Sequence, residues 1–319
     1  MPQATLVTGA AGFAGSHLVE GLTRDGVDVA AWHRPGHSAL PQLGGRWQAV
    51  DLLDRAAVRS ALAALRPVRV YHCAGAAHVG QSWATTTATL AVNVRATHHL
   101  IEGIREERID TSVLIPSSAM VYAPADRPLR EDDRIGPASP YALSKLAQEL
   151  VGMDNPGGPR VMIARAFNHM GPRQSPEFAA SGFARTIAQI ELGHRQPEVE
   201  VGNLDARRDF TDVRDTVRAY RLIVDHGLPG RAYNVCTGRA VTIRTLLDLL
   251  LARARVPIQV TIDRTRLRPN DVPLVVGDPE RIQRELGWYP QASLEHTLDD
   301  LLQFWRESLS DPVHELPAV

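Results

Sequence analysis

Ala4-Thr5-Leu6-Val7-Thr8-Gly9-Ala10-Ala11-Gly12-Phe13-Ala14-Gly15 is the stretch of the chain that decides its fold. It begins with a short apolar run typical of a buried strand, and residues 16–22 continue with the apolar periodicity of a helix. The three glycines permit a tight turn and let backbone N–H groups approach a pyrophosphate at the positive end of the helix dipole. The stretch therefore predicts a dinucleotide-binding unit, although its Gly-x-x-Gly-x-x-Gly spacing differs from the usual Gly-x-Gly-x-x-Gly.

Further apolar runs follow the first one and alternate with helical segments. We expect strands at residues 28–32, 47–52, 68–75, 112–118 and 160–165, and a return to the same sheet at 232–235. Strands that alternate with helices indicate a parallel, doubly wound sheet. In such a sheet, ligands bind at the carboxyl ends of the strands.

The pattern changes beyond residue 166. Residues 167–172 are expected to form a loop, and helices are expected at 177–192, 213–225, 243–253, 279–286 and 294–309. This predicts an α/β fold in which a Rossmann-like doubly wound parallel sheet carries a smaller, discontinuous C-terminal substrate lobe. We expect the dinucleotide-binding domain to comprise residues 1–166 plus 211–236, and the substrate lobe to comprise 167–210 plus 237–319.

The chain contains one lysine among 35 lysine and arginine residues, and this Lys145 lies four residues after Tyr141. A lysine placed at random would follow one of the six tyrosines at this distance in 6 of 319 positions, roughly 2%. On a helix the two side chains share a face. A nearby ammonium favours the phenolate and lowers a tyrosine pKa, which suits general acid/base chemistry. Ser139 as N-cap and Pro140 in the first turn predict that this helix begins here.

The ends of the next strands carry candidate cofactor contacts. His33 and Arg34 follow the second strand, where an NAD-binding protein would have an acid that binds the ribose. Arginine in that place favours a 2′-phosphate, so NADP(H) is the expected cofactor and NAD(H) the alternative; whether Arg34 is only a solvated loop residue stays open. Asp51 is placed to touch adenine, and the small residues 73–75 end the fourth strand.

Composition excludes several classes of function. The net charge of −1 gives no general attraction to nucleic acid or to a membrane surface. No apolar run is long enough to span a bilayer. The two cysteines, Cys73 and Cys236, are expected to be free thiols in a reducing cytoplasm, and no metal site is expected.

These residues together resemble the extended short-chain dehydrogenase/reductase family. The resemblance rests on the three glycines of the first turn and on Ser118, Tyr141 and Lys145. Further stretches are similar to the branch that acts on GDP-mannose-derived sugars, namely 167–172, 201–210, 268–273, 276–279 and 286–288. The chain departs from that branch at Arg173, where glycine is more usual, and at Met170, where threonine is commoner.

The resemblance implies a role for each site residue. Tyr141 would give a proton to the sugar oxygen as hydride arrives, Lys145 would lower the Tyr141 pKa and bind the nicotinamide ribose, and Ser118 would hydrogen-bond the same oxygen. The implied cofactor contacts are Gly9, Gly12, Phe13, Ala14, Gly15, His33, Arg34, Asp51, Leu52, Cys73, Ala74, Gly75, Tyr141 and Lys145. The implied substrate contacts are His78, Ser118, Asn168, Asn203, Arg208, Arg268 and Asp271.

Two residues separate the activities within this branch. Dehydratases have acids after the position of Ser118, whereas this chain has Ala119 and Met120, which cannot move a proton. This favours a reductase acting on the C4 keto group of a GDP-4-keto-6-deoxy-hexose, with GDP-D-rhamnose or its C4 epimer as product. The alternatives are a nucleotide-sugar 4-epimerase with tightly bound NAD, a GDP-mannose 4,6-dehydratase and a catalytically silent dinucleotide-sensing regulator. The resemblance also implies a homodimer through a four-helix bundle of the helix at 84–107 and the helix bearing Tyr141.

Overall fold

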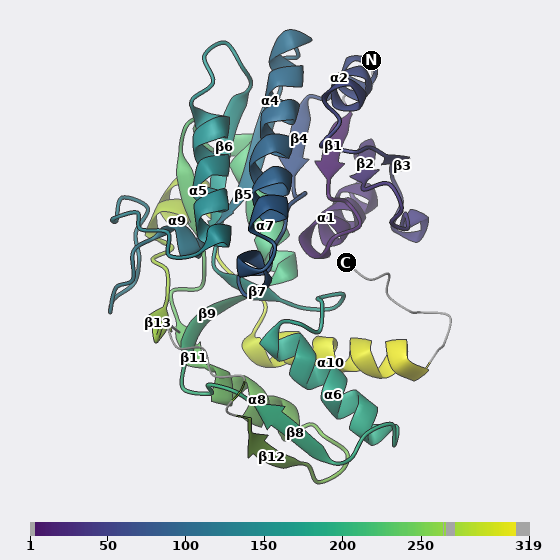
Figure 1. Ribbon diagram of the computed structural model, residues 1–319, viewed down its shortest axis with the longest axis vertical. Coiled ribbons are helices and arrows are strands. Elements are labelled where there is room, and N and C mark those ends of the chain that lie inside the picture. Colours follow the sequence, from purple (N-terminus) through teal and green to yellow (C-terminus); the bar gives the residue numbers. More distant parts are fainter. Residues whose placement is uncertain (1–3, 264, 266–271, 311–319) are drawn as a thin grey trace.

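The structure, a computed structural model, describes residues 4–263, 265 and 272–310 (Figure 1). Its larger part is a seven-stranded parallel sheet with the order β10-β6-β5-β4-β1-β2-β3. The strands are β1 Thr5–Thr8, β2 Val29–His33, β3 Arg46–Ala49, β4 Arg69–His72, β5 Ser112–Ser118, β6 Arg160–Ala166 and β10 Ala232–Val235. The strand order reverses between β1 and β4, which is the point where such sheets bind ligands. The expected Rossmann-like fold is confirmed.

Helices cover both faces of this sheet because its strands are apolar on both sides. Val7 and Tyr71 belong to one buried cluster, which α1 Phe13–Arg24 and α7 Val213–His226 complete. Leu6 and Val70 belong to a second cluster on the opposite face. That face is covered by α2 Arg55–Leu65, α4 Ala96–Glu106 and α5 Pro140–Met153. Strands buried on both faces have near-continuous apolar sequences, and for this reason they could be predicted from the sequence.

The smaller lobe lies below the sheet in Figure 1 and has a core of its own. Ala184, Leu246 and Leu301 bring three of its helices together around this core. Its helices are α6 Ala179–Glu191, α8 Ile243–Leu251 and α10 Leu294–Ser310. Its short strands are β7 Asn168–Met170, β8 Glu198–Val201, β9 Arg207–Asp212, β11 Ala240–Thr242, β12 Gln259–Ile262 and β13 Leu274–Val275.

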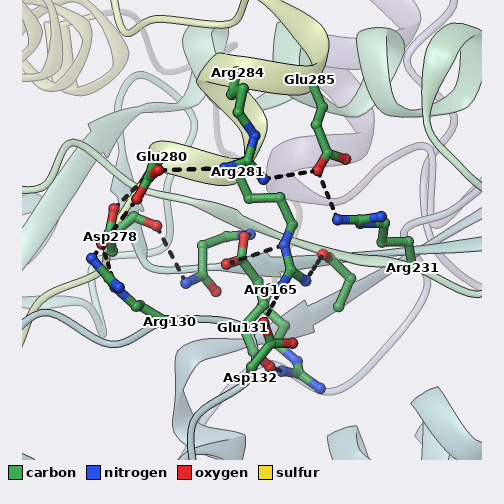
Figure 2. Close-up of polar contacts among 12 residues, drawn as sticks. Arg130, Glu131, Asp132, Arg165, Arg231, Asp278, Glu280, Arg281, Arg284 and Glu285 are labelled. Atoms are coloured by element: carbon green, nitrogen blue, oxygen red, sulfur yellow. Dashed lines mark hydrogen bonds and ion pairs between the residues drawn. The ribbon is translucent and has the colours of Figure 1, made fainter.

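The chain returns to the sheet near its C-terminal end. In α9 Glu280–Leu286 and just after it, Ile282 and Trp288 pack into the core on the α1 and α7 side. A group of ion pairs fixes this return (Figure 2): Arg130 with Asp278 at 2.8 Å, Arg281 with Asp132 at 2.6 Å, and Arg231 with Glu285 at 2.7 Å. Several arginines of this arginine-rich chain are therefore structural.

One expectation about a single element was wrong. Residues 168–170 form β7 rather than a loop, because they pair in parallel with Phe210–Asp212 of β9. The long helix expected at 84–107 is present as a helical run over residues 86–106. It consists of α3 Thr86–Leu90, a π-helical turn η3 Ala91–Arg95, and α4. Short 3₁₀ turns also occur: η1 Pro41–Leu43, η2 Gln81–Trp83 and η4 Ala119–Val121.

None of the helices in the part of the chain that the structure describes is long and apolar enough to cross a bilayer.

Candidate active site

The glycine-rich turn packs directly against the end of β4. Gly9 has a φ of +64°, and a Cβ on it would lie 2.6 Å from the Cα of Ala74. A Cβ on Gly15 would lie 2.2 Å from the carbonyl oxygen of Gly9. Glycine is therefore required at both positions for α1 to start so close to β1 and β4. Gly12, the N-cap of α1, offers no side-chain acceptor, so the N–H groups of the first turn are open to an anion such as a cofactor pyrophosphate.

The start of α5 places Tyr141 at the same edge of the sheet. The Ser139 hydroxyl accepts a hydrogen bond from the Ala142 N–H at 3.1 Å, and Pro140 occupies the first turn, which confirms the predicted helix start. The Tyr141 N–H donates to the Ser82 hydroxyl at 3.2 Å. Ser118 ends β5, and its hydroxyl lies close enough to the Tyr141 phenol to act on the pKa of that phenol. The two residues expected to contact one substrate oxygen therefore lie together.

The electrostatics of this pair differ from the expectation. Burial raises the pKa of Tyr141, and the nearby Ser118 hydroxyl offsets this only in part. Lys145 is not among the groups that shift the pKa of Tyr141. Its ammonium donates to the Pro116 carbonyl at 2.8 Å and to Gln148 Oε1 at 2.9 Å. A raised pKa keeps the phenol protonated at neutral pH, as a proton donor requires. Burial lowers the pKa of Lys145 itself to about 8.

Small residues keep space between Lys145 and the cofactor edge. A Cβ on Gly75 would lie 2.8 Å from Asn93 Oδ1 and 3.6 Å from the Lys145 ammonium nitrogen. The preceding Cys73 is a free thiol whose pKa burial raises to about 12. A larger residue at 75 would therefore collide with the groups that surround Lys145.

The ends of β2 and β3 carry the remaining expected cofactor residues. His33 Nδ1 lies 3.2 Å from the Arg34 carbonyl oxygen, and the Arg34 side chain is exposed. Asp51 is also exposed, and one of its carboxylate oxygens accepts from the Leu53 N–H at 2.9 Å. The Leu52 carbonyl oxygen lies 3.0 Å from His99 Nδ1 of α4. Arg34 thus occupies an exposed turn at the place where the ribose of a bound dinucleotide is expected.

The residues expected to contact a substrate are more dispersed. His78 lies 2.7 Å from the Glu177 carboxylate and stacks on Phe178 at 4.5 Å between ring centroids, so it joins the loop after β4 to the smaller lobe. Asn168 is exposed at the start of β7. Asn203 Oδ1 accepts from the Asp205 N–H, and the Arg208 guanidinium donates to the Arg207 carbonyl. Arg268 and Asp271 lie outside the described residues.

The segment after β7 contacts the glycine-rich turn. Phe13 stacks on His169 with 5.6 Å between ring centroids and an interplanar angle of 2°. Arg173 has a φ of +70°, which explains why glycine is the more usual residue there. Its guanidinium donates to Glu20 of α1 at 2.6 Å, and this ion pair compensates part of the backbone cost.

Sequence reasoning missed a group of buried polar residues around Lys145. These are Thr8, His72, Asn93, Thr97 and Gln148. One signal was available for Gln148, since Tyr141, Lys145 and Gln148 are spaced i, i+4, i+7 and so share the buried face of α5. A polar residue on a buried helix face indicates a hydrogen-bonded partner behind it. For a metal, no group of three or more His, Cys, Asp or Glu side chains is suitably arranged among residues 4–263, 265 and 272–310.

A family model described as GDP-mannose 4,6 dehydratase matches residues 6–301. The chain belongs to this family. Its sequence is 34% identical over 316 residues to GDP-6-deoxy-D-mannose reductase of Pseudomonas aeruginosa, covering 98% of this chain and all of that one. The resemblance to extended short-chain dehydrogenase/reductases is thereby confirmed.

Solved structures of similar proteins agree with this placement. The structure of RMD from Pseudomonas aeruginosa complexed with NADPH matches with a TM-score of 0.85 and 32% identity, covering 96% of this chain and 99% of that one. The UDP-glucose 4-epimerase from Brucella ovis in complex with NAD matches with a TM-score of 0.86 and 25% identity, covering 95% and 98%. Both the reductase and the epimerase reading thus have relatives with the same fold.

Proposed function

We propose that this member of the family is an NAD(P)H-dependent reductase of the C4 keto group of a GDP-4-keto-6-deoxy-hexose. The observation that carries the proposal is the buried Tyr141 phenol close to Ser118, which is followed in the chain by Ala119 and Met120, residues with no acid or base. The similarity to the Pseudomonas reductase over nearly the full length of both chains supports the same reading. The product would be GDP-D-rhamnose or its C4 epimer.

The roles of the side chains follow from their contacts. When bound, the nicotinamide cofactor supplies the hydride. Ser118 Oγ accepts from the Met120 N–H at 3.2 Å, which leaves its own proton free to hold the substrate oxygen beside Tyr141. Tyr141 then donates its proton to that oxygen as negative charge develops there. Lys145 lies one turn further along α5, and the family resemblance implies that its ammonium would hold the nicotinamide ribose when the cofactor is bound.

A dehydratase is the less favoured activity, because elimination of water needs an acid and a base near the reacting carbons. Ala119 is buried directly after Ser118 and cannot serve, and Met120 carries no titratable group. The buried Glu149 is not free for this role, since Arg165 pairs with it at 2.8 Å. The epimerase remains the second candidate, because it uses the same Ser, Tyr and Lys and one similar structure has that activity.

We propose NADPH as the preferred reductant, with NADH as the alternative. Arg34 is exposed at the end of β2, and none of the described residues forms an ion pair with it. An unpaired guanidinium there suits a ribose 2′-phosphate. The Pseudomonas structure with NADPH supports this choice, whereas the epimerase structure with NAD supports the alternative.

A substrate panel tests the proposed activity. Purified protein is incubated with GDP-, UDP- and dTDP-linked 4-keto-6-deoxy sugars and with NADPH or NADH, and the products are identified by NMR. Consumption of reduced cofactor with a GDP-linked 4-keto sugar is the expected result. Bound NAD and interconversion of C4 epimers without net cofactor consumption would establish the epimerase instead, and loss of water from GDP-mannose would establish a dehydratase. A protein that binds the cofactor but turns over nothing would be the silent regulator.

We further propose a homodimer formed by α5 and the helical segment 84–107 of two copies. Leu143 and Leu150 of α5 lie seven residues apart on one face and are 51% and 55% exposed. Trp83, which directly precedes the helical segment, is 66% exposed. Exposed large apolar side chains at this spacing indicate a helix-pairing surface. Light scattering should give the mass of two chains for the wild type and of one chain for Leu143→Glu with Leu150→Glu.

Two coarser assignments accompany the proposed reaction. We propose that residues 1–166 with 211–236 hold the dinucleotide and that 167–210 with 237–319 hold the nucleotide sugar, with α9 packed back on the cofactor side. We also propose a cytoplasmic location, since Cys73 and Cys236 are both free thiols.

A further inference from the structure

Behind Lys145 a continuous chain of buried polar side chains crosses from α5 to β1. Gln148 Oε1 accepts from the Lys145 ammonium, and Gln148 Nε2 donates to the Thr97 hydroxyl at 2.9 Å. The same hydroxyl lies 2.9 Å from His72 Nε2, and His72 Nδ1 lies 2.8 Å from the Thr8 hydroxyl. The chain ends at the cofactor edge, where the Ala74 N–H donates to Thr8 Oγ1 at 3.3 Å.

Counting the hydrogens of Thr97 fixes the direction of every bond in this chain. Its hydroxyl has one proton, which it donates to the Asn93 carbonyl oxygen at 2.6 Å. Thr97 therefore accepts the other two hydrogen bonds, so His72 carries its proton on Nε2. His72 Nδ1 is then the acceptor of the Thr8 proton. Burial lowers the pKa of His72 to about 3, in agreement with a neutral ring.

The same count orients Gln148. Its amide nitrogen must face Thr97, which has no proton left to give, and its carbonyl oxygen must then face Lys145. A reversed amide would place an NH₂ group against the ammonium and two acceptors against each other at Thr97. Each unsatisfied buried group of this kind is strongly unfavourable. Gln148 is thus held in the one orientation that accepts from Lys145.

We propose that Gln148 is a positioning residue for Lys145, held in place by the Thr97–His72–Thr8 chain. Gln148 and the Pro116 carbonyl take two of the three ammonium protons. The third remains for the side near Gly75, where a cofactor is expected to lie. This proposal rests on the proposed function for one point, the catalytic role of Lys145. The orientation of Gln148 follows from the contacts alone.

Lys145 is also influenced by other groups packed around it. Burial opposes its protonated form, and Glu149 on the same helix favours it. Cys73 at the end of β4 is a neutral thiol in this pH range, because burial raises its pKa to about 12. In return its charge lowers the pKa values of His72 and of His169 in β7. A substitution of Gln148 leaves all of these groups in place, so a change in Lys145 can be assigned to the lost amide.

The chain itself supplies a direct readout, since Lys145 is its only lysine. Protein grown with lysine labelled with ¹³C at Cε, and carrying a lysine-free tag, gives a single lysine signal whose pH titration reports Lys145. Gln148→Leu removes the acceptor of a charged hydrogen bond, so the titration midpoint should fall by about one pH unit. Gln148→Glu keeps the size and adds a negative charge, so the midpoint should rise.

Matched variants keep the test decisive. Gln303→Leu makes the same change on an exposed part of α10 and should leave the midpoint at the wild-type value. Thr97→Val removes the anchor of the Gln148 amide and should lower the midpoint in the same direction as Gln148→Leu. NADPH binding and thermal unfolding show whether each variant is folded. If Gln148→Leu does not fold, the near-isosteric Gln148→Glu is used for the test.

Unchanged midpoints in the folded Gln148 variants would overturn the proposal whether or not the protein reduces a keto sugar. Conversely, shifted midpoints together with a failed substrate panel would overturn the proposed function and leave the positioning role intact. In an active enzyme, the limb of the kcat pH profile that reports Lys145 should move with the NMR midpoint, which a purely structural role would not cause.

Discussion

At the scale of single residues, the site depends on how burial acts on Tyr141. Burial raises the pKa of the phenol, so it stays protonated across the neutral range. Replacing Tyr141 with Phe should lower turnover of the keto sugar by about 10²–10⁴-fold, because the proposed proton donor is lost. NADPH binding, measured by fluorescence titration, should change little. A Phe variant with turnover within about a factor of two of the wild type would rule out this role.

Arg34 is the residue that we propose to set the cofactor preference. A guanidinium on the 2′-phosphate contributes a charged hydrogen bond, which exposure reduces toward the lower end of its usual range. A preference of about tenfold for NADPH over NADH, equivalent to roughly 1.4 kcal/mol, is the expected result. Arg34→Ala should remove most of this preference, and added salt should weaken it in the wild type. Steady-state kinetics give the answer: equal kcat/KM for both cofactors, unchanged in Arg34→Ala, would show that Arg34 is only a solvated residue.

At the scale of elements, local signals predicted those parts whose structure is set by nearby residues. The turn at Gly9 and Gly15 could be predicted from the sequence, because no larger residue fits there. The start of α5 could be predicted as well, because Ser139 caps it. β7 could not be predicted from the sequence, because its three residues become a strand only by pairing with β9, some forty residues later in the chain. The π-helical turn likewise depends on distant contacts, since Asn93 bonds to the backbone of Ala76.

The site was predictable to a similar extent. Ser118 and Tyr141 lie together as expected, because strand ends and the start of the following helix meet at one edge of a parallel sheet. The partner of Lys145 was not foreseen, since Gln148 is oriented by residues from three other elements. A single sequence records spacing along α5 but not which strand or helix faces it.

The segment after β7 allows a test at the element scale. Arg173 combines a left-handed backbone with an ion pair to Glu20. Arg173→Ala loses the ion pair and keeps the unfavourable φ, whereas Arg173→Gly loses the ion pair and relieves the backbone. The glycine variant should therefore be more stable than the alanine variant by about 1 kcal/mol. Urea unfolding of the two variants measures this difference directly, and equal stabilities would show that the backbone at 173 is not strained.

At the scale of the whole molecule, a histidine takes part in three of the contacts between the cofactor side and the smaller lobe with the segment leading into it. Phe13 stacks on His169, His78 pairs with Glu177, and His17 of α1 lies 2.8 Å from the Pro172 carbonyl oxygen. Burial lowers the pKa of two of these histidines, His17 and His169, so folding disfavours their protonated forms.

For His17, the effect of pH on the free energy of unfolding has a predictable sign. Burial, aided by the Arg173 charge, lowers its pKa from 6.5 to about 4. Between these pH values the unfolded chain binds a proton at this position and the folded protein does not, so the free energy of unfolding falls as the pH falls. His17→Gln can still donate to the Pro172 carbonyl but does not titrate, so its stability should fall less steeply between pH 6.5 and 4. Urea unfolding across this window tests the prediction, with the pH 7 value of each protein as its own reference. Parallel curves for wild type and variant would show that His17 does not couple acid to the fold.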